Sequence, residues 1–395
     1  MSQREPLTRR RFLYLAGLSP LALAACGQTL AGQSSSPSGA ASKPAGSANA
    51  GAPSSAPATS GSAAASPSIA ASAASKPSAS TALASGLTPP AQTIAVFNTG
   101  SKDVTLVDAA KNEVADTKPL GAAIRWLGEE QDYWDGKLVW TYDFPNNKLA
   151  MLGIDPTTWQ VAKTYQAGNG PGHSVVLSQD RKIASINVAG DNKILSFDTA
   201  SGNQVASFDS GKFPCDLDNS TDYKVLYTPE RDQDTVAALD AATLKLIKRV
   251  SFPTGNKPHM LRVSPDGQTI WVQEAAAGNN VVLKASDLSV LAREKSGNTP
   301  VNNAWTPDGR FSIVTNSGET TVSLFDAQTY KLIKTIEVGQ GPSVVSFRQD
   351  GKFAYVSLTG ANALAVIDTA TWTVAKTVKT GQMPQGVIIL PPSPR

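Results

Sequence analysis

The chain has two histidines and two cysteines, and three of these four side chains stand at matching places in the sequence. His173 and His259 follow the proline of a Gly-x-x-Pro turn by one or two residues, and Cys215 follows such a proline directly. Met260 adjoins His259, and Met383 precedes the proline of the last such turn. Imidazole and thiolate, with a thioether nearby, form a ligand set for copper or zinc. The residue types therefore predict a metal site if the fold brings them together.

The Gly-x-x-Pro turns belong to a longer repeat. Consecutive prolines of these turns are 42 to 44 residues apart. A second marker, an Asp that closes the third predicted strand of each unit, keeps the same period and is replaced once, by Ala285. Because this Asp repeats with the unit, we expect it to accept backbone N–H bonds in the following turn. The prolines are Pro171, Pro214, Pro258, Pro300, Pro342 and Pro384, and the marker residues are Asp108, Asp155, Asp198, Asp240, Asp326 and Asp368.

One unit, residues 339–380, contains four short segments of alternating apolar residues with turn residues between them. The alternation predicts strands near 344–347, 353–357, 363–367 and 373–378. A four-stranded antiparallel sheet of this kind has a second apolar face that it cannot bury alone, so it needs neighbours like itself. A period near 42 residues with four strands per unit is typical of a β-propeller.

Two segments carry a resemblance to a known family. Ile313-Val-Thr-Asn-Ser-Gly318 and Tyr355-Val-Ser-Leu-Thr-Gly360 resemble the YVTN-type β-propeller repeat, and the resemblance covers roughly residues 91–394. It implies the architecture. It implies no particular chemistry, because propellers host enzymes, electron carriers and binding scaffolds alike.

The ends of the repeat predict how the ring closes. Residues 93–98 match the second strand of a unit, whereas residues 385–390 match a first strand with no unit after it. The C-terminal strand would therefore join the N-terminal three, which leaves no blade with an open edge. We expect an all-β propeller over residues 91–395, with seven blades of four antiparallel strands each.

The resemblance places the candidate ligands. In propellers of this kind the first strand of each blade lies nearest the axis, so its start lines the mouth of the central channel. His173, Cys215 and His259 would then surround one opening on three consecutive blades, with Met260 beside them. Two alternatives stay open. A histidine after this proline is common in YVTN-type repeats, where it caps the turn, and a single cysteine is often a small buried apolar residue.

The same mouth offers a site without metal. Asp216, Asn302, Asn303 and Gln385 would add donors and acceptors for a small ligand, and lactonase-type seven-bladed propellers use a channel of this sort. The chain shows no paired carboxylates at motif spacing for acid–base chemistry. We therefore expect a non-enzymatic protein and keep a lactonase-like hydrolase as an alternative.

An acidic and aromatic segment lengthens the first hairpin of the second unit. It contains Asp132, Tyr133, Trp134 and Asp135, preceded by acidic residues at 129 and 130. Exposed aromatic rings beside carboxylates can stack on sugars or anchor a protein partner, so these four residues are candidate partner-binding residues. Alternatively, the Trp packs between blades and Asp135 only forms a turn.

The N-terminal part of the chain is predicted to be an export signal followed by a spacer. Residues 8–13 resemble the twin-arginine export signal, and the apolar stretch that follows ends in Leu-Ala-Ala-Cys, which looks like a lipobox. The resemblance implies that residues 1–26 are an export signal and that Cys26 becomes lipidated. Residues 27–90 are nearly all Ala, Ser, Pro, Gly and Thr, a composition that predicts a disordered stalk.

Net charge limits the class of partner. The chain carries +3, of which residues 1–90 contribute +5, so the propeller carries −2. A mildly acidic domain with dispersed charges has no footprint for nucleic acid. We expect a monomeric, extracytoplasmic propeller, lipid-anchored to a membrane at Cys26, that binds a protein or glycan partner and needs no cofactor. The alternative is a redox protein that holds copper, zinc or another cofactor at the channel mouth.

Overall fold

The computed structural model of the protein describes residues 92–128 and 132–390. The predicted export signal, Cys26 and the predicted stalk lie outside the described residues. Within the described ranges, no helix has the length and apolar character needed to span a bilayer.

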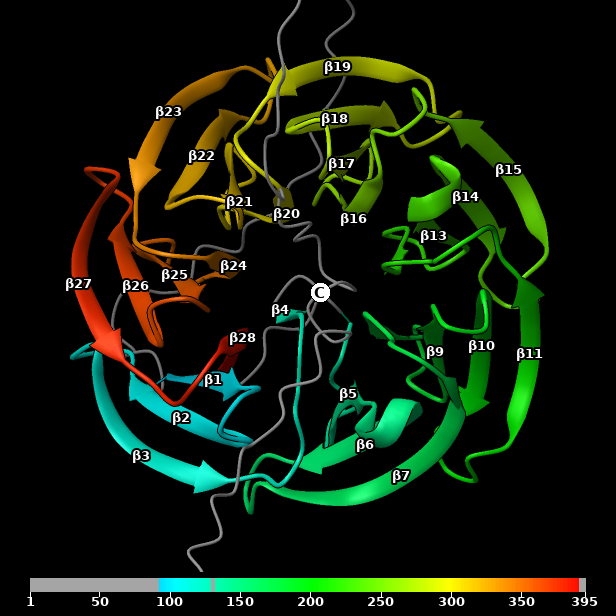
Figure 1. Cartoon of the computed structure of the whole chain (residues 1–395), viewed down its shortest axis with the longest axis horizontal. Helices are drawn as coiled ribbons and strands as arrows, with labels where there is room; N and C mark the ends of the chain where they lie inside the picture. The colour runs from blue at the N-terminus through cyan, green and yellow to red at the C-terminus, as the bar shows by residue number, and fades with distance from the viewer. Residues whose placement is uncertain (1–91, 129–131, 391–395) are drawn as a thin grey trace, which may run out of the picture. The chain divides into compact units, whose positions relative to one another are not determined.

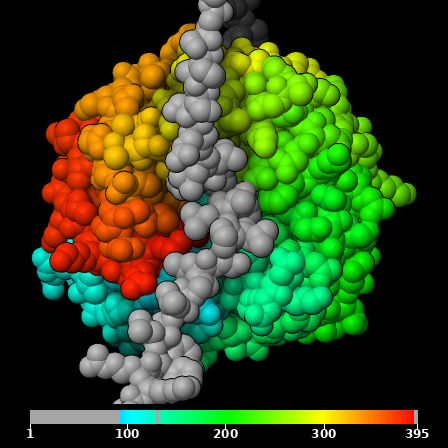
Figure 2. Space-filling model, viewed as in Figure 1, coloured from blue at the N-terminus to red at the C-terminus, as the bar shows by residue number. Residues whose placement is uncertain are grey.

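Seven sheets follow one another around a ring in sequence order, which confirms the predicted seven-bladed β-propeller (Figures 1 and 2). Each full blade is an antiparallel meander whose first strand lies innermost. The predicted strands of residues 339–380 are found within a residue or two of their expected bounds. Blade three holds β8 (Val175–Leu177), β9 (Ile183–Val188), β10 (Lys193–Asp198) and β11 (Gln204–Asp209). Blade four holds β12 (Asp218–Asn219), β13 (Val225–Glu230), β14 (Thr235–Asp240) and β15 (Leu246–Ser251), with a 3₁₀ turn η2 (Arg231–Gln233).

The next three blades are the most regular. Blade five holds β16 (Pro258–Val263), β17 (Thr269–Glu274), β18 (Asn279–Lys284) and β19 (Val290–Lys295). Blade six holds β20 (Pro300–Trp305), β21 (Phe311–Asn316), β22 (Thr321–Asp326) and β23 (Leu332–Glu337). Blade seven holds β24 (Pro342–Phe347), β25 (Phe353–Leu358), β26 (Ala363–Asp368) and β27 (Thr373–Lys379). The innermost strands β16, β20 and β24 are buried at every residue, because they are covered by neighbouring blades on both faces.

Blade one is built from both ends of the described chain. The C-terminal strand β28 (Pro384–Leu390) pairs antiparallel with β1 (Thr93–Asn98), which continues into β2 (Asp103–Asp108) and β3 (Glu113–Pro119). The predicted closure of the ring is therefore present, and it leaves β1 hydrogen-bonded on both sides.

Blade two departs from the repeat. Its sheet has three strands, β5 (Val139–Asp143), β6 (Lys148–Asp155) and β7 (Gln160–Asn169), with a 3₁₀ turn η1 (Pro145–Asn147). The segment expected as its first strand contributes only β4 (Leu127–Gly128), which pairs parallel with β28 of blade one. Next to β5, the described chain before it makes an isolated bridge between Trp134 and Val139, and the Trp140 N–H donates to the Tyr133 carbonyl at 2.7 Å.

The repeated Asp closes a turn in each unit, as expected. Asp326 accepts the Thr329 N–H at 2.7 Å, and Asp198 accepts the Ser201 N–H at 2.7 Å. In blade five, where the marker is missing, Asp287 accepts the Ser289 N–H at 2.9 Å instead. These side chains stabilise turns at the end of the third strand.

Apolar side chains from several blades meet at the axis. The buried cluster there includes Trp126 after blade one, Met260 of blade five, Val301 of blade six, Val344 of blade seven and Val387 of blade one. Packed apolar side chains therefore join the inner strands of blades one, five, six and seven.

Candidate metal centre

Three short segments with matching positions in their blades hold His173, Cys215 and His259. His173 lies in the turn before β8, Cys215 lies before β12, and His259 is the second residue of β16. Asn187 of β9 links the first two segments. Its Oδ1 accepts the N–H groups of His173 (3.2 Å) and Ser174 (2.8 Å), and its Nδ2 donates to the Pro214 carbonyl at 2.8 Å.

The three side chains converge. One ligating atom from each of His173, Cys215 and His259 lies within 4.8 Å of the others, and all three residues are buried. The two imidazole rings have centroids 5.4 Å apart and stand nearly perpendicular, at 85°. The structure thus brings together the three residues that the sequence singled out as ligands.

Both imidazoles are neutral at physiological pH. Burial holds the pKa of His173 well below its usual value, and electrostatic interactions with His259 and Arg231 lower it further. Burial also lowers the pKa of His259 to about 3, with a further contribution from Arg231. The Nδ1 atoms of both rings have no hydrogen-bond partner among the described residues. A neutral imidazole with an unengaged ring nitrogen is the state that binds metal.

Aromatic side chains pack against the cluster of His173, Cys215 and His259. The Trp126 indole stacks on His173 at 6.3 Å and 18°, and meets His259 edge-on at 5.9 Å and 70°. Phe213 contacts His173 edge-on at 6.0 Å, and the Arg231 guanidinium lies 3.8 Å from the Phe213 ring centroid. The sequence analysis missed Trp126 because it belongs to the irregular segment of blade two, where no repeat register predicts its position.

The other predicted channel-mouth residues have structural partners. Asn302 Oδ1 accepts the Val345 N–H at 3.1 Å, so it joins the inner strands of blades six and seven. Gln385 Oε1 accepts the Thr99 hydroxyl at 3.2 Å. Met260 packs in the axial apolar cluster. Each of these side chains is thus engaged with neighbouring inner strands or with the segment next to them.

Asp216 forms a buried ion pair that the sequence analysis did not anticipate. Its Oδ2 accepts from Arg262 Nη1 and from the Leu261 N–H (3.1 Å), and both charged side chains are fully buried. Burial raises the pKa of Asp216 to about 6, against the opposing effect of Arg262. The only sequence signal for this pair is an Arg within an otherwise mostly apolar first strand.

The candidate partner-binding residues lie within the fold. Asp132 is buried and accepts from Arg181 (3.1 Å), Tyr223 (2.9 Å) and Asn219 (3.3 Å), so it ties the blade-two hairpin to blades three and four. This carboxylate therefore stabilises the packing between blades.

The neighbouring residues of this hairpin are similarly engaged. Tyr133 is buried in an apolar cluster against which the partly buried Trp134 packs. Asp135 accepts the Leu138 N–H and the Trp140 indole N–H, both at 2.7 Å, which is the turn role foreseen as the alternative.

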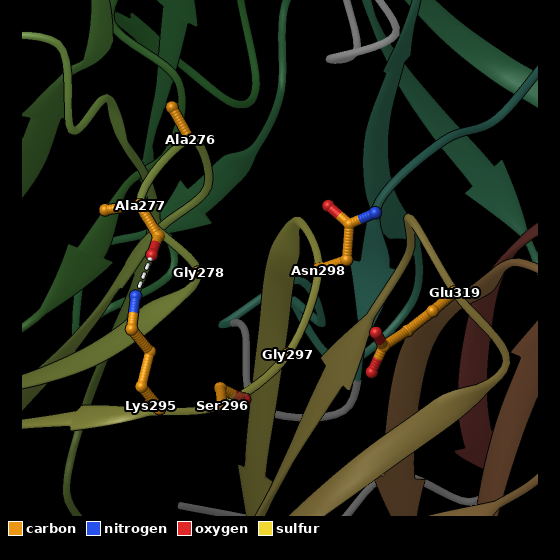
Figure 3. Close-up of a pocket in the computed structure, with 8 residues that line it drawn as sticks. All are labelled: Ala276, Ala277, Gly278, Lys295, Ser296, Gly297, Asn298 and Glu319. Atoms are coloured by element: carbon orange, nitrogen blue, oxygen red, sulfur yellow. Dashed lines mark hydrogen bonds between the residues drawn. The ribbon is translucent and has the colours of Figure 1, made fainter.

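A shallow pocket of about 330 Å³ lies between blades five and six (Figure 3). Lys295 Nζ donates to the Ala277 carbonyl at 2.6 Å on one side of it, and Asn298 and Glu319 stand on the other. None of the predicted channel-mouth residues lines this pocket.

Comparisons with known proteins agree with the fold. Residues 155–385, more than half of the chain, match the model of the choice-of-anchor I domain. A structure from Lactobacillus plantarum is 17% identical, with a TM-score of 0.66, and covers 76% of this chain and 99% of its own. Hydrazine synthase of Kuenenia stuttgartiensis is 20% identical (TM-score 0.59), with 70% of this chain and 92% of its own covered.

A candidate 6-phosphogluconolactonase from Bacteroides uniformis is 14% identical, with a TM-score of 0.64, and covers 76% of this chain and 99% of its own. At these identities the likeness shows the fold alone. The comparison with curated proteins gave no match.

Proposed function

The chain belongs to the choice-of-anchor I domain family, and from this premise we propose that it is an anchored extracytoplasmic binding protein whose ligand is a soft transition metal ion. The family suggests a cell-surface or extracytoplasmic protein. The observation that carries the metal proposal is the convergence of His173, Cys215 and His259 from three consecutive blades.

The donor set fits such an ion. Imidazole nitrogen binds zinc and copper, and thiolate sulfur selects soft or borderline metals over calcium and magnesium. Ligand atoms on one tetrahedral ion lie about 3.5 Å apart, so modest side-chain adjustments from the present separations, within 4.8 Å, bring all three atoms onto one ion. The bond from Asn187 to the Pro214 carbonyl keeps the His173 and Cys215 segments side by side.

Each residue has a distinct role in binding. His173 and His259 offer neutral nitrogen without first losing a proton, because burial keeps them unprotonated. Cys215 must release its proton when the metal binds, since the thiolate is the ligand. Binding therefore releases one proton per ion, and the apparent affinity rises with pH.

The test is metal stoichiometry of the full chain. We expect one equivalent of copper or zinc after reduction, loading and desalting, measured by plasma mass spectrometry. Cys215→Ser should lose the metal and keep the fold. Ser343→Ala, at the same register on blade seven, is the matched control and should keep the metal. Wild-type protein without stoichiometric metal would overturn the proposal.

The anchor part of the proposal rests on the sequence. The twin-arginine motif and the Leu-Ala-Ala-Cys string support export followed by lipidation of Cys26. We expect the wild-type protein in the membrane fraction and Cys26→Ser in the soluble extracytoplasmic fraction. Membrane association that survives this substitution would contradict a lipid anchor at Cys26.

A further inference from the structure

One side of the candidate metal centre is formed by the indole of Trp126 and by the apolar cluster to which it belongs. Trp126 contacts both histidines, stacking on His173 and meeting His259 edge-on, and it is itself buried. Its indole also belongs to the axial apolar cluster together with Met260. A fourth ligand or a bound water on this side would have to displace packed apolar side chains.

We propose that the centre selects Cu(I) over Zn(II), and that the indole of Trp126 sets this selectivity by closing the side where Zn(II) needs a fourth ligand. The inference rests on the proposed function, because it names the ion and oxidation state for the same three ligands.

Coordination number gives the first argument. Among the described residues, the cluster holds three ligating side chains of the His, Cys, Asp or Glu types. Structural Zn(II) is almost always tetrahedral, and catalytic Zn(II) fills its fourth position with water. Cu(I) is soft, prefers thiolate and imidazole, and is stable with three ligands. The three donors thus complete a site for Cu(I) and leave Zn(II) one ligand short.

Charge gives the second argument. A Cys215 thiolate neutralises Cu(I), whereas with Zn(II) the centre keeps a positive charge in a fully buried position. Burying a net charge is costly, so the monovalent ion is favoured.

The position of the ring gives the third argument. The indole lies nearly parallel to the His173 ring, with 18° between the planes and 6.3 Å between the centroids, so it covers that side of the centre. Trp126 is held against the histidines although its φ of +53° is unfavourable for a bulky residue. Its backbone N–H donates to the Gln385 carbonyl at 2.6 Å, which fixes the segment to blade one.

The experiment compares the two ions on the reduced full-length protein under anaerobic conditions. Cu(I) is titrated against a chromophoric Cu(I) chelator, Zn(II) against a chromophoric Zn(II) chelator, and tryptophan fluorescence is recorded in both. We expect one equivalent of Cu(I) bound at least about 100-fold more tightly than Zn(II), with strong fluorescence quenching. Trp126→Leu should tighten Zn(II) binding about tenfold by opening the side that the indole closes, leave Cu(I) binding within a few-fold, and abolish most of the quenching.

Trp159→Leu is the matched control. Trp159 is also buried and also has a positive φ, +56°, but it packs in a different apolar cluster. This variant should keep the wild-type preference for Cu(I). If Trp126→Leu does not fold, Trp126→Phe replaces it, with an intermediate Zn(II) affinity expected.

The results distinguish the inference about Cu(I) selectivity from the proposed metal binding itself. Wild-type protein that binds Zn(II) as tightly as Cu(I), or Trp126 variants with unchanged selectivity, would overturn this inference and leave the metal centre standing. Wild-type protein that binds neither ion would overturn the proposed function as well.

Discussion

Two groups of blades share one backbone arrangement in the inner ring but carry different side chains there. We call blades three to five the ligand half and blades six and seven the packing half. In blades five, six and seven the first strands β16, β20 and β24 pair with their second strands through the same irregularity after the turn proline. Yet blades three to five place His173, Cys215 and His259 near that proline, whereas blades six and seven place Val301 and Val344 there. At this register blades three to five offer candidate ligands and blades six and seven offer apolar side chains, so the repeat supplies positions and substitutions at one register supply chemistry.

The largest effect is expected from removing β28, the inner strand of blade one, which lies beside the packing half. Deleting residues 384–395 removes β28, which pairs with β1 along its whole length and carries buried Val387, Ile388 and Ile389. We expect loss of cooperative thermal unfolding and of near-ultraviolet circular dichroism, because the ring cannot close. Deleting residues 391–395 alone should leave both signals unchanged. A cooperative transition in the longer deletion would show that closure is dispensable.

A second comparison contrasts equivalent acceptors in the two halves. Asp216 and Asn302 each accept an N–H of the next blade's inner strand, from Leu261 and Val345. Asp216→Ala also leaves Arg262 buried without its ion-pair partner, so it should cost about 3–5 kcal/mol of unfolding free energy. Asn302→Ala should cost about 1–2 kcal/mol. Urea unfolding measures both, and equal losses would contradict an energetic role for the ion pair.

A third prediction concerns a substitution that gives the ligand half a residue of the packing half. Cys215→Val places the residue of blade six at the corresponding position of blade four. Cu(I) affinity should fall at least about 100-fold, roughly 2.7 kcal/mol, while thermal stability of the metal-free protein stays close to wild type. Loss of affinity accompanied by a large loss of stability would point to unfolding rather than to ligand removal.

Between pH 6.5 and pH 5, the dependence of folding stability on pH should come mainly from residues of the ligand half. Burial lowers the pKa of His173 and His259, so below pH 6.5 the unfolded state binds protons that the folded state excludes, and stability falls towards pH 3. Asp216 acts oppositely, because its raised pKa makes the folded state bind a proton as pH falls below about 6. Between pH 6.5 and pH 5, above the range where most carboxyls titrate, the metal-free protein should therefore lose stability as pH falls. Denaturant unfolding across this range tests it against His259→Leu, which should lose less than the wild type.

The smallest effect should be equal in both halves. Asp198 of blade three and Asp326 of blade six make the same turn contacts. Each substitution by Ala should cause a small loss of stability of the same size, measured by urea unfolding. A clear difference between the two variants would mean that the turns are not equivalent.

Features that follow the repeat could be predicted from the sequence, whereas features that depend on segments outside the repeat could not. The 42-residue period gave the blades, the closing strand and the convergence of His173, Cys215 and His259, because equivalent positions must face a shared axis. Trp126 and Asp132 were misjudged or unseen, since both belong to the irregular part of blade two, where burial depends on how a unique segment packs. The Asp216–Arg262 pair was also missed, because its partners lie on different blades and no spacing rule connects them.

The placement of β1 has a mechanical consequence. Residue 92 leads directly into β1, which is bonded to β2 on one side and to β28 on the other. A force pulling on the N-terminal part of the chain therefore acts on an interior strand and must rupture two rows of backbone bonds together. This blade should resist such a pull better than one whose loaded strand stood at an edge.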